Sequence, residues 1–397
     1  MKIGILTFHF AINYGALLQC YAFQEYLKGQ GHEVKIINFI PPNYQRFSCW
    51  SKTGRRKFLL SGLKQLILEL IPASTRRLMF GFNLELKHTY INWKYARLQK
   101  NIFKKFRNRY LNISEPYSID SFSTITKKKY DAIIVGSDQV WNWSDHYHTT
   151  YFLAPLSNFD GKRISYATCC ALNKVDVQHR KKLKESLLKF NKISVRNLET
   201  FSFVNNLTGK SPPIVVDPVL LHDFNVFLKK KPKNYNEYIL TYIIGDEIEG
   251  GHEKTINEIK LNNNNLPVVS IMLAKNKSKP FSWSDKTLWS VTPKKWLDLF
   301  FNASFVYTDS FHGVLFAIKF KKSFLAYYKE KVRASRFIDL INRYELDKSI
   351  VSSFDDARSK KSFKELPNYE KLDIIVEKNI RFSINFLDEA LKTDSVN

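Results

Sequence analysis

The chain has 397 residues, of which 44% are hydrophobic and 15% aromatic, enough apolar side chains for more than one folded core. Lysine and arginine number 62 against 37 aspartate and glutamate, so the net charge is +25, which indicates an anionic partner such as a phosphorylated substrate, a nucleic acid or an acidic lipid surface. The four cysteines form no C-x-x-C pair, which argues against a zinc site or a disulfide scaffold and favours a cytoplasmic protein.

A strand, a helix and a second strand are predicted in the first 40 residues. The apolar run from Ile3 to Phe8 lacks the long hydrophobic region and the cleavage site of a signal peptide, so we expect a strand. Apolar residues at helical spacing follow from Tyr14 to Lys28, and a second apolar run extends from Glu33 to Phe39. Such a unit builds a parallel sheet, which binds ligands at the carboxyl ends of its strands.

Residues 46–129 interrupt the alternation of strands and helices and are predicted to form a helical, strongly basic insertion. Its apolar stretch, 58–82, contains Glu69 and Pro72, which argues against a helix that spans a membrane. Two uses stay open: a packed helical hairpin with a solvated basic side, or a helix that lies on an anionic membrane surface.

Strand-like runs resume after the insertion in two groups. The first group is 130–135, 163–167, 192–196 and 213–217, and the second is 238–244, 266–271 and 304–308, with a helix predicted from Pro293 to Asn302. The sequence therefore predicts an α/β fold of two doubly wound, Rossmann-like domains that face each other across a cleft. The expected segments are a first domain at 1–222, a second at 223–372, and a C-terminal helix at 373–397 that crosses back to the first.

The sharpest motif, 309–313, is a polar turn between a predicted strand and a predicted helix. Such a turn presents helix-terminal N–H groups to an anion at the end of the strand. A histidine exchanges protons near neutral pH, so His312 is the candidate general acid or base, with phosphate binding as the alternative. Asp309 is a candidate for activating a hydroxyl or, alternatively, for capping the helix; Ser310 and Gly313 are candidate substrate contacts.

A second polar turn, 136–142, follows another predicted strand. Its glycine lets a ligand approach the backbone, and its polar side chains offer hydrogen bonds to hydroxyls. Trp141 suits stacking on a sugar ring, but an Asx-capped turn above a buried tryptophan explains the same residues equally well. The candidate substrate contacts are Gly136, Ser137, Gln139, Trp141 and Asn142, with Asp138 as a candidate base.

Cationic side chains are needed to hold an anionic substrate. Arg196 ends an apolar strand and is predicted either to clamp a carboxylate or phosphate or to form an inter-domain ion pair. Lys275 and Arg333, in the second predicted domain, are further candidates for the clamp. The sequence shows no acidic cluster of the metal-ligand type, so no metal is expected.

Taken together, these motifs resemble the polysaccharide pyruvyl transferase family over most of the chain. The segments that carry the resemblance are Asn13–Ala16 with Gln19, 136–142, 165–167, 194–196, 216–218 and 309–313. The resemblance implies a fold similar to the GT-B glycosyltransferases, with Asn13 and Tyr14 among the substrate contacts. The sequence departs from the family pattern at two places. Asn197 stands where the family commonly has an acidic residue, and Thr168–Cys170 replaces small residues.

The resemblance also implies phosphoenolpyruvate as co-substrate, no cofactor, and a pyruvate ketal formed on a sugar of a polysaccharide precursor. The glycan acceptor is either a polymer or lipid-linked; a basic face suits work at an anionic cytoplasmic leaflet, so peripheral membrane contact stays open, and no nucleic acid partner is expected. Two rival functions also stay open: a nucleotide-sugar-dependent GT-B glycosyltransferase, and a basic nucleic-acid- or lipid-binding protein without catalysis.

Overall fold

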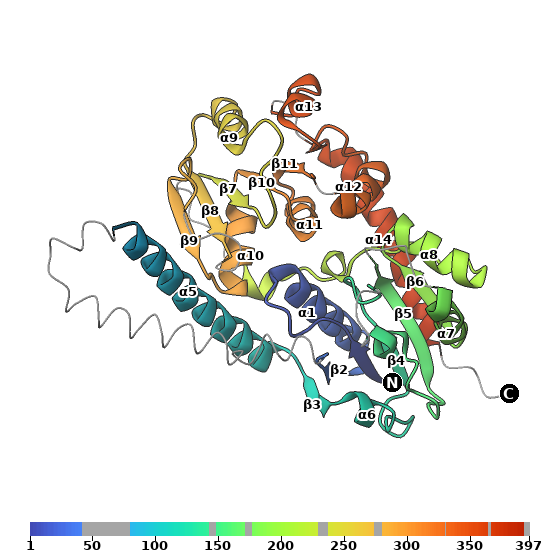
Figure 1. The fold of residues 1–397 in the computed structure, drawn as a ribbon. Helices are drawn as coiled ribbons and strands as arrows, with labels where there is room; N and C mark the ends of the chain where they lie inside the picture. Colours follow the sequence, from blue (N-terminus) through green and yellow to red (C-terminus); the bar gives the residue numbers. More distant parts are fainter. Residues whose placement is uncertain are drawn as a thin grey trace, which may run out of the picture.

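Two parallel sheets of six strands, each flanked by helices, make up the computed structural model (Figure 1). The structure describes residues 1–41, 80–142, 148–170, 177–228, 237–273, 280–329, 331–363 and 367–392. The arrangement is a two-domain Rossmann-like fold, as the sequence predicted.

The first sheet has the order β3-β2-β1-β4-β5-β6 and the second the order β12-β11-β10-β7-β8-β9. The strands of the first are β1 (Lys2–Leu6), β2 (Glu33–Phe39), β3 (Ile113–Tyr117), β4 (Ala132–Val135), β5 (Lys162–Thr168) and β6 (Lys192–Val195). Those of the second are β7 (Ile239–Tyr242), β8 (Val268–Met272), β9 (Lys286–Trp289), β10 (Phe305–Thr308), β11 (Ser323–Tyr327) and β12 (Ile350–Val351). The central strands β4, β7 and β10 are buried at every residue, as expected when helices cover both faces of a parallel sheet.

The helices that flank the two sheets fall into two groups, one before β7 in the chain and one after it. Those before β7 are α1 (Tyr14–Gly29), α5 (Phe80–Tyr110), α6 (Ile119–Phe122), α7 (Val177–Leu188) and α8 (Leu198–Thr208). Those after β7 are α9 (His252–Leu261), α10 (Pro293–Asn302), α11 (Phe311–Lys319), α12 (Lys331–Tyr344), α13 (Phe354–Ser359) and α14 (Tyr369–Leu391). Most of them begin at a Ser, Thr or Asn cap, and α10 occupies the residues predicted for it.

One predicted strand is absent and one strand within the insertion was not predicted, and both cases involve proline. Residues 213–217 form no strand; Ile214 makes only an isolated bridge to Val195, because the preceding proline pair cannot donate to a sheet ladder. The insertion at 46–129 is not wholly helical, since β3 lies within it. Pro116 obscures the strand pattern of β3 but is tolerated there because β3 is an edge strand.

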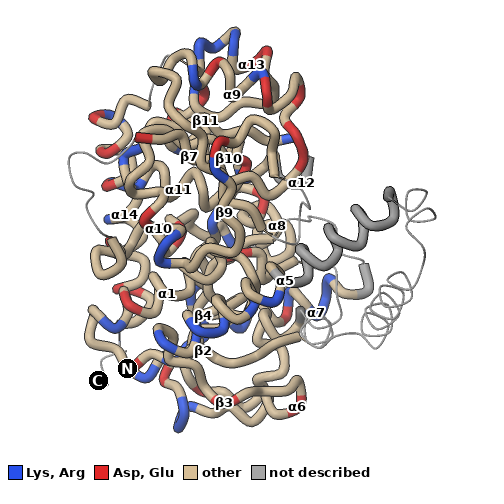
Figure 2. Tube along the Cα trace, turned by 90° about the vertical axis from the view of Figure 1, so that its left-hand side faces the viewer, with Lys and Arg blue, Asp and Glu red and all other residues tan. Residues whose placement is uncertain are grey.

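Residues 46–79 of the predicted insertion lie outside the described part, and α5 is the insertion's long helix. In the coloured part of α5, several positions of the chain trace are blue, which marks lysine or arginine (Figure 2). None of the helices in the described part has the length and hydropathy that crossing a membrane requires.

The last helix, α14, contacts both sheets. Near its start, the Tyr369 hydroxyl donates to the carbonyl of Lys322, which precedes β11. Near its end, the Ser383 hydroxyl accepts the N–H of Val216, and Phe386 packs beside Tyr166 of β5. The helix thus runs from the second sheet to the first; the boundaries 1–222, 223–372 and 373–397 stay predictions.

The two sheets are joined by a continuous apolar core that includes Tyr14. Its ring stacks on Trp296 of α10, with 5.5 Å between ring centroids and 14° between planes. Its hydroxyl donates a 2.6 Å hydrogen bond to the carbonyl of Val291. Tyr14 therefore fixes the start of α1 to the second domain.

Replacing Tyr14 should separate the ring's contribution from that of its hydroxyl. We expect Tyr14→Ala to lower the free energy of unfolding by about 3–5 kcal/mol, because it leaves a cavity beside Trp296. Tyr14→Phe keeps the ring and should cost only about 1 kcal/mol for the lost hydrogen bond. Urea denaturation of the three proteins checks this, and equal losses in both variants would contradict the stacking role.

Candidate active site

A cavity of about 280 Å³ lies between the carboxyl ends of the two sheets. Its wall combines the loop after β1, the turn after β4, the end of β7, the turn after β10, and α12. The lining residues are Phe8, Ala11, Asn13, Ala16, Asp138, Gln139, Ile244, Asp309, Ser310, Phe311, His312, Arg336 and Phe337. The cavity thus occupies the edge of the sheets where parallel α/β folds bind ligands.

Two helices begin at the cavity wall. Asn13 caps α1 by accepting the N–H of Ala16, and Ser310 caps α11 by accepting the N–H of Gly313. The N-terminal end of a helix carries a partial positive charge and unpaired N–H groups. Two such ends beside one cavity make it favourable for an anion.

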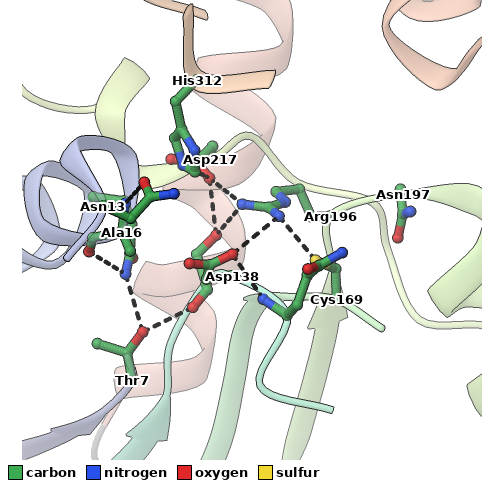
Figure 3. A network of polar contacts seen from close by, with 12 residues as sticks. Thr7, Asn13, Ala16, Asp138, Cys169, Arg196, Asn197, Asp217 and His312 are labelled. Carbon is green, nitrogen blue, oxygen red and sulfur yellow. Dashed lines mark hydrogen bonds and ion pairs between the residues drawn. The ribbon is translucent and has the colours of Figure 1, made fainter. Parts of the chain in front are cut away.

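A buried ion pair, Arg196 with Asp217, lies behind the cavity (Figure 3). One guanidinium nitrogen donates to Asp217 Oδ2 at 2.6 Å and to the Ser137 hydroxyl at 3.1 Å, and the other donates to Cys169 Sγ at 2.8 Å. The Ser137 hydroxyl also donates to Asp217. Arg196 is only 2% exposed, so water does not compete for these bonds.

His312 reaches this ion pair from the second domain. Its Nε2 lies 3.5 Å from Asp217 Oδ2, the distance of an ion pair when the ring is protonated. Burial by itself raises the pKa of Asp217, but the neighbouring His312 and Arg196 outweigh it and hold that pKa well below its usual range. Asp217 is therefore a carboxylate that faces the imidazole.

The His312 ring rests directly on Gly15 in the first turn of α1. A Cβ atom at Gly15 would overlap the ring at Cγ and Nδ1. The absence of a side chain at position 15 is thus what lets a histidine of one domain lie against a helix of the other.

Asp309 has both carboxylate oxygens occupied by backbone groups. Oδ1 accepts the N–H of Ile244 at 2.7 Å, and Oδ2 accepts the N–H of Gly245 at 2.6 Å. It therefore holds the loop after β7, and the cap of α11 is Ser310 rather than Asp309.

Asp138 presents a carboxylate at the cavity wall. Its backbone has φ of 83°, a conformation that non-glycine residues rarely adopt. Its Oδ1 accepts the N–H of Gln139, and Arg196 Nη2 lies 3.8 Å away. The unusual backbone turns Asp138 and Gln139 toward the cavity.

The loop after β1 is held from behind by His9. Its Nδ1 bonds the carbonyl of Thr7 and its Nε2 the amide of Asn38, both at 3.2 Å. Burial lowers the pKa of His9 to about 4, so the ring is neutral at pH 7. Arg107 of α5 donates to the carbonyl of Phe10 in the same loop.

Comparison with known proteins identifies the family. A sequence model described as polysaccharide pyruvyl transferase matches residues 13–328. The chain belongs to this family. No curated protein sequence matches it significantly.

Two solved structures are similar to this pyruvyl transferase family member. Arabidopsis thaliana UGT89C1 complexed with UDP-L-rhamnose has 13% identity and a TM-score of 0.50, covering 98% of this chain and 97% of that one. A putative UDP-N-acetylglucosamine 2-epimerase from Listeria monocytogenes has 11% identity and a TM-score of 0.49, covering 99% and 97%. At such identities the likeness concerns the fold alone.

The structure brings six of the predicted site residues together at the cavity of this family member: Asn13, Asp138, Gln139, Asp309, Ser310 and His312. Ser137 lies just behind them, on the Arg196–Asp217 pair. Arg196 itself does not line the cavity; it forms a buried ion pair with Asp217, but both residues belong to the predicted first domain, so the pair is not the inter-domain one that was expected. Their roles in catalysis stay predictions.

Other predicted contacts lie elsewhere, and packing explains them. Trp141 is fully buried, stacks on Phe152 and donates to the carbonyl of Tyr151, so the buried-tryptophan alternative is the right one. Tyr14 belongs to the inter-domain core. Gly136 and Gly313 are needed for packing, because a Cβ at Gly136 would crowd Thr7 and one at Gly313 would crowd Thr308. Neither of these glycines lines the cavity, and Asn142 does not line it either. Lys275 and the side chain of Arg333 lie outside the described part of the chain.

Sequence reasoning missed Arg336 and the role of Asp217. Arg336 lines the cavity from α12, one turn after Arg333, but it belongs to no turn motif and lies beyond the matched segment 13–328. Asp217 stood within the 216–218 motif, yet nothing in the sequence showed that Arg196 and His312 would converge on it.

The departures from the family pattern have structural roles. Asn197 caps α8 by accepting the N–H of Thr200, and it does not line the cavity. Cys169 accepts a hydrogen bond from Arg196, and Cys170 donates its N–H to the Thr200 hydroxyl. Among the described residues, no group of three or more His, Cys, Asp or Glu side chains is placed to hold a metal ion.

The close contact of His312 with Gly15 predicts different effects for two glycines of α1. We expect Gly15→Ala to destabilise the protein by about 1–3 kcal/mol, because the ring must move. Gly29→Ala, at the far end of the helix, meets no atom within 4 Å and should be neutral or slightly stabilising. Thermal denaturation compares them; equal midpoints would contradict the packing of His312.

The low pKa of His9 predicts a pH dependence of stability. Its folded pKa, about 4, lies below the unfolded value of 6.5, so the unfolded state takes up the proton first. The contribution of neutral His9 to the free energy of unfolding is complete above pH 6.5. As the pH falls toward 4 the free energy of unfolding decreases by about 2–3 kcal/mol. Urea denaturation at pH 7, 5.5 and 4.5 should show this loss in the wild type and a smaller one in His9→Gln.

Proposed function

We propose that this chain transfers the pyruvyl carbons of phosphoenolpyruvate to two hydroxyls of one sugar in a polysaccharide precursor, closing a ketal and releasing phosphate. The observation that carries the proposal is the cavity itself, in which the starts of α1 and α11 meet His312 and Arg336. Membership of the family supports a transferase that acts on a glycan.

The charges around the cavity suit a small polyanion. Phosphoenolpyruvate carries a carboxylate and a phosphate. Among the described lining residues, Arg336 is the one lysine or arginine, and a guanidinium can bind either anion through two hydrogen bonds. The two helix starts supply N–H donors, whereas the charge of Arg196 behind the cavity is paired with Asp217 and its hydrogen bonds go to Asp217, Ser137 and Cys169.

The proposed reaction needs an acid, a base and a group that stabilises the departing phosphate. A proton is added to C3 of the enol, and C2 becomes positive. One sugar hydroxyl bonds to C2 and gives up its proton; the C2–O bond to phosphate breaks, and the second hydroxyl bonds to C2 and loses its proton in turn. The proton taken up at C3 balances the first one released, and the second leaves with phosphate.

We assign the proton at C3 to His312, because its ring lies at the cavity wall with Asp217 behind it. Asp138 is our choice for the hydroxyl proton, since its carboxylate also lines the cavity. Asp309 is a less suitable base because two backbone N–H groups occupy its oxygens. Its proposed part is to position the loop after β7.

A cytoplasmic location and an absence of metal or organic cofactor complete the proposal. Cys20, Cys169 and Cys170 are free thiols, as is usual in a reducing compartment. The cations and helix starts named above can neutralise the donor without a metal ion.

Phosphate release from phosphoenolpyruvate tests the proposal, with galactose-, mannose- and N-acetylated-sugar glycans as acceptors. We expect release only with an acceptor. His312→Ala should slow it by about 100-fold or more, since it removes the acid. Arg336→Gln should raise the KM for phosphoenolpyruvate about 10- to 100-fold, whereas Arg358→Gln, on the exposed face of α13, should change neither.

Arg196→Ala is a poor substitute for these variants, because it would leave Asp217 as a buried, unpaired charge and lower stability by about 3–5 kcal/mol. If the wild type neither binds nor turns over phosphoenolpyruvate with any acceptor, the donor assignment is wrong. Nucleotide sugars are then the donors to test.

A further inference from the structure

The described part of α5 carries a strongly basic flank outside the cavity. Residues 95–110 contain six lysines or arginines and no aspartate or glutamate. Four of them recur at spacings of three, four and three residues, which places them on one side of a helix. We call this set the α5 flank: Arg97, Lys100, Lys104 and Arg107.

A neighbouring side of α5 is buried and fixes the helix to both domains. Phe103 packs on Tyr14, with 4.9 Å between ring centroids. At the other end, Tyr95 stacks on Trp289 of β9, and its carbonyl accepts the hydroxyl of Ser290. The α5 flank is therefore held in place rather than ordered by a ligand, which lowers the entropic cost of binding.

The α5 flank is exposed along most of its length and ends at the loop after β1. Arg97, Lys100 and Lys104 face solvent, and Arg107 is half-buried. Arg107 donates to the carbonyl of Phe10, whose loop contributes Phe8 and Ala11 to the cavity wall. A ligand lying along the flank would thus lead directly to the reacting centre.

We propose that the α5 flank binds an anionic polysaccharide and guides one of its sugars into the cavity. The inference rests on the proposed function in taking the cavity as the place where the sugar reacts. Its four cations extend over about 15 Å of helix axis. A single diphosphate is too short to meet all four, whereas a chain that carries a carboxylate or phosphate on successive sugars can follow them.

The test compares two triple variants that each lose three positive charges. One is Arg97→Gln, Lys100→Gln, Lys104→Gln on the α5 flank. The matched control is Lys181→Gln, Lys182→Gln, Lys184→Gln, at exposed positions of α7. Both leave the buried side of their helix intact, and far-UV circular dichroism checks the fold.

Binding is measured by fluorescence anisotropy with labelled alginate oligosaccharides, in the full chain and without phosphoenolpyruvate. We expect the α5 variant to bind roughly tenfold more weakly than the wild type and to depend less on salt. The α7 variant should match the wild type. Neutral dextran of the same length should not compete.

The proposal is overturned if the two triple variants bind alginate with equal affinity, or if dextran binds as well as alginate. It is also overturned if single-stranded DNA displaces labelled alginate at a lower concentration of anionic groups than unlabelled alginate does. The last would point to nucleic acid. Because this assay uses no donor, it separates the two proposals. If the two triple variants differ in binding but the protein does not turn over phosphoenolpyruvate, the proposal for the α5 flank stands and only the assignment of the donor is wrong.

Discussion

The buried ion pair of Arg196 and Asp217 is the interaction on which the site depends. It gathers the end of β6, the turn after β4 through Ser137, and the start of α11 through His312. Arg343 of α12 donates to the backbone carbonyl of Arg196 and so ties α12 to the same point. A buried pair of this kind adds little net stability, but either charge alone would be costly, so each residue requires the other.

The charge of the cavity depends on which of its carboxylates are already paired with a cation or with backbone N–H groups. Asp217 is balanced by Arg196 and His312, and Asp309 by two backbone N–H groups. Asp138 also lines the cavity, with Arg196 Nη2 3.8 Å from its carboxylate, and Arg336 and two helix starts add positive character. This balance favours an anionic ligand in the cavity, while the charge of α5 lies outside it and faces solvent.

The two domains are held together by packing as well as by charge. Residues of both domains are in direct contact at two places. Tyr14 packs between Trp296 and Phe103, and the His312 ring lies against Gly15. The relation of His312 to the first domain is therefore set by the apolar core that continues between the sheets. The same core fixes α5, and with it the direction of the α5 flank.

The sequence by itself determined the fold class and the two cavity turns, because buried strands and polar turns between a strand and a helix have local signatures, as at 305–308 and 309–313. It left Trp141 and Arg196 ambiguous, since a buried role and a binding role use the same residue types. Only the tertiary structure decided these two, placed Arg336 in the cavity and brought His312 to Asp217, 95 positions away along the chain. Such contacts depend on how the two sheets pack, which no local pattern records.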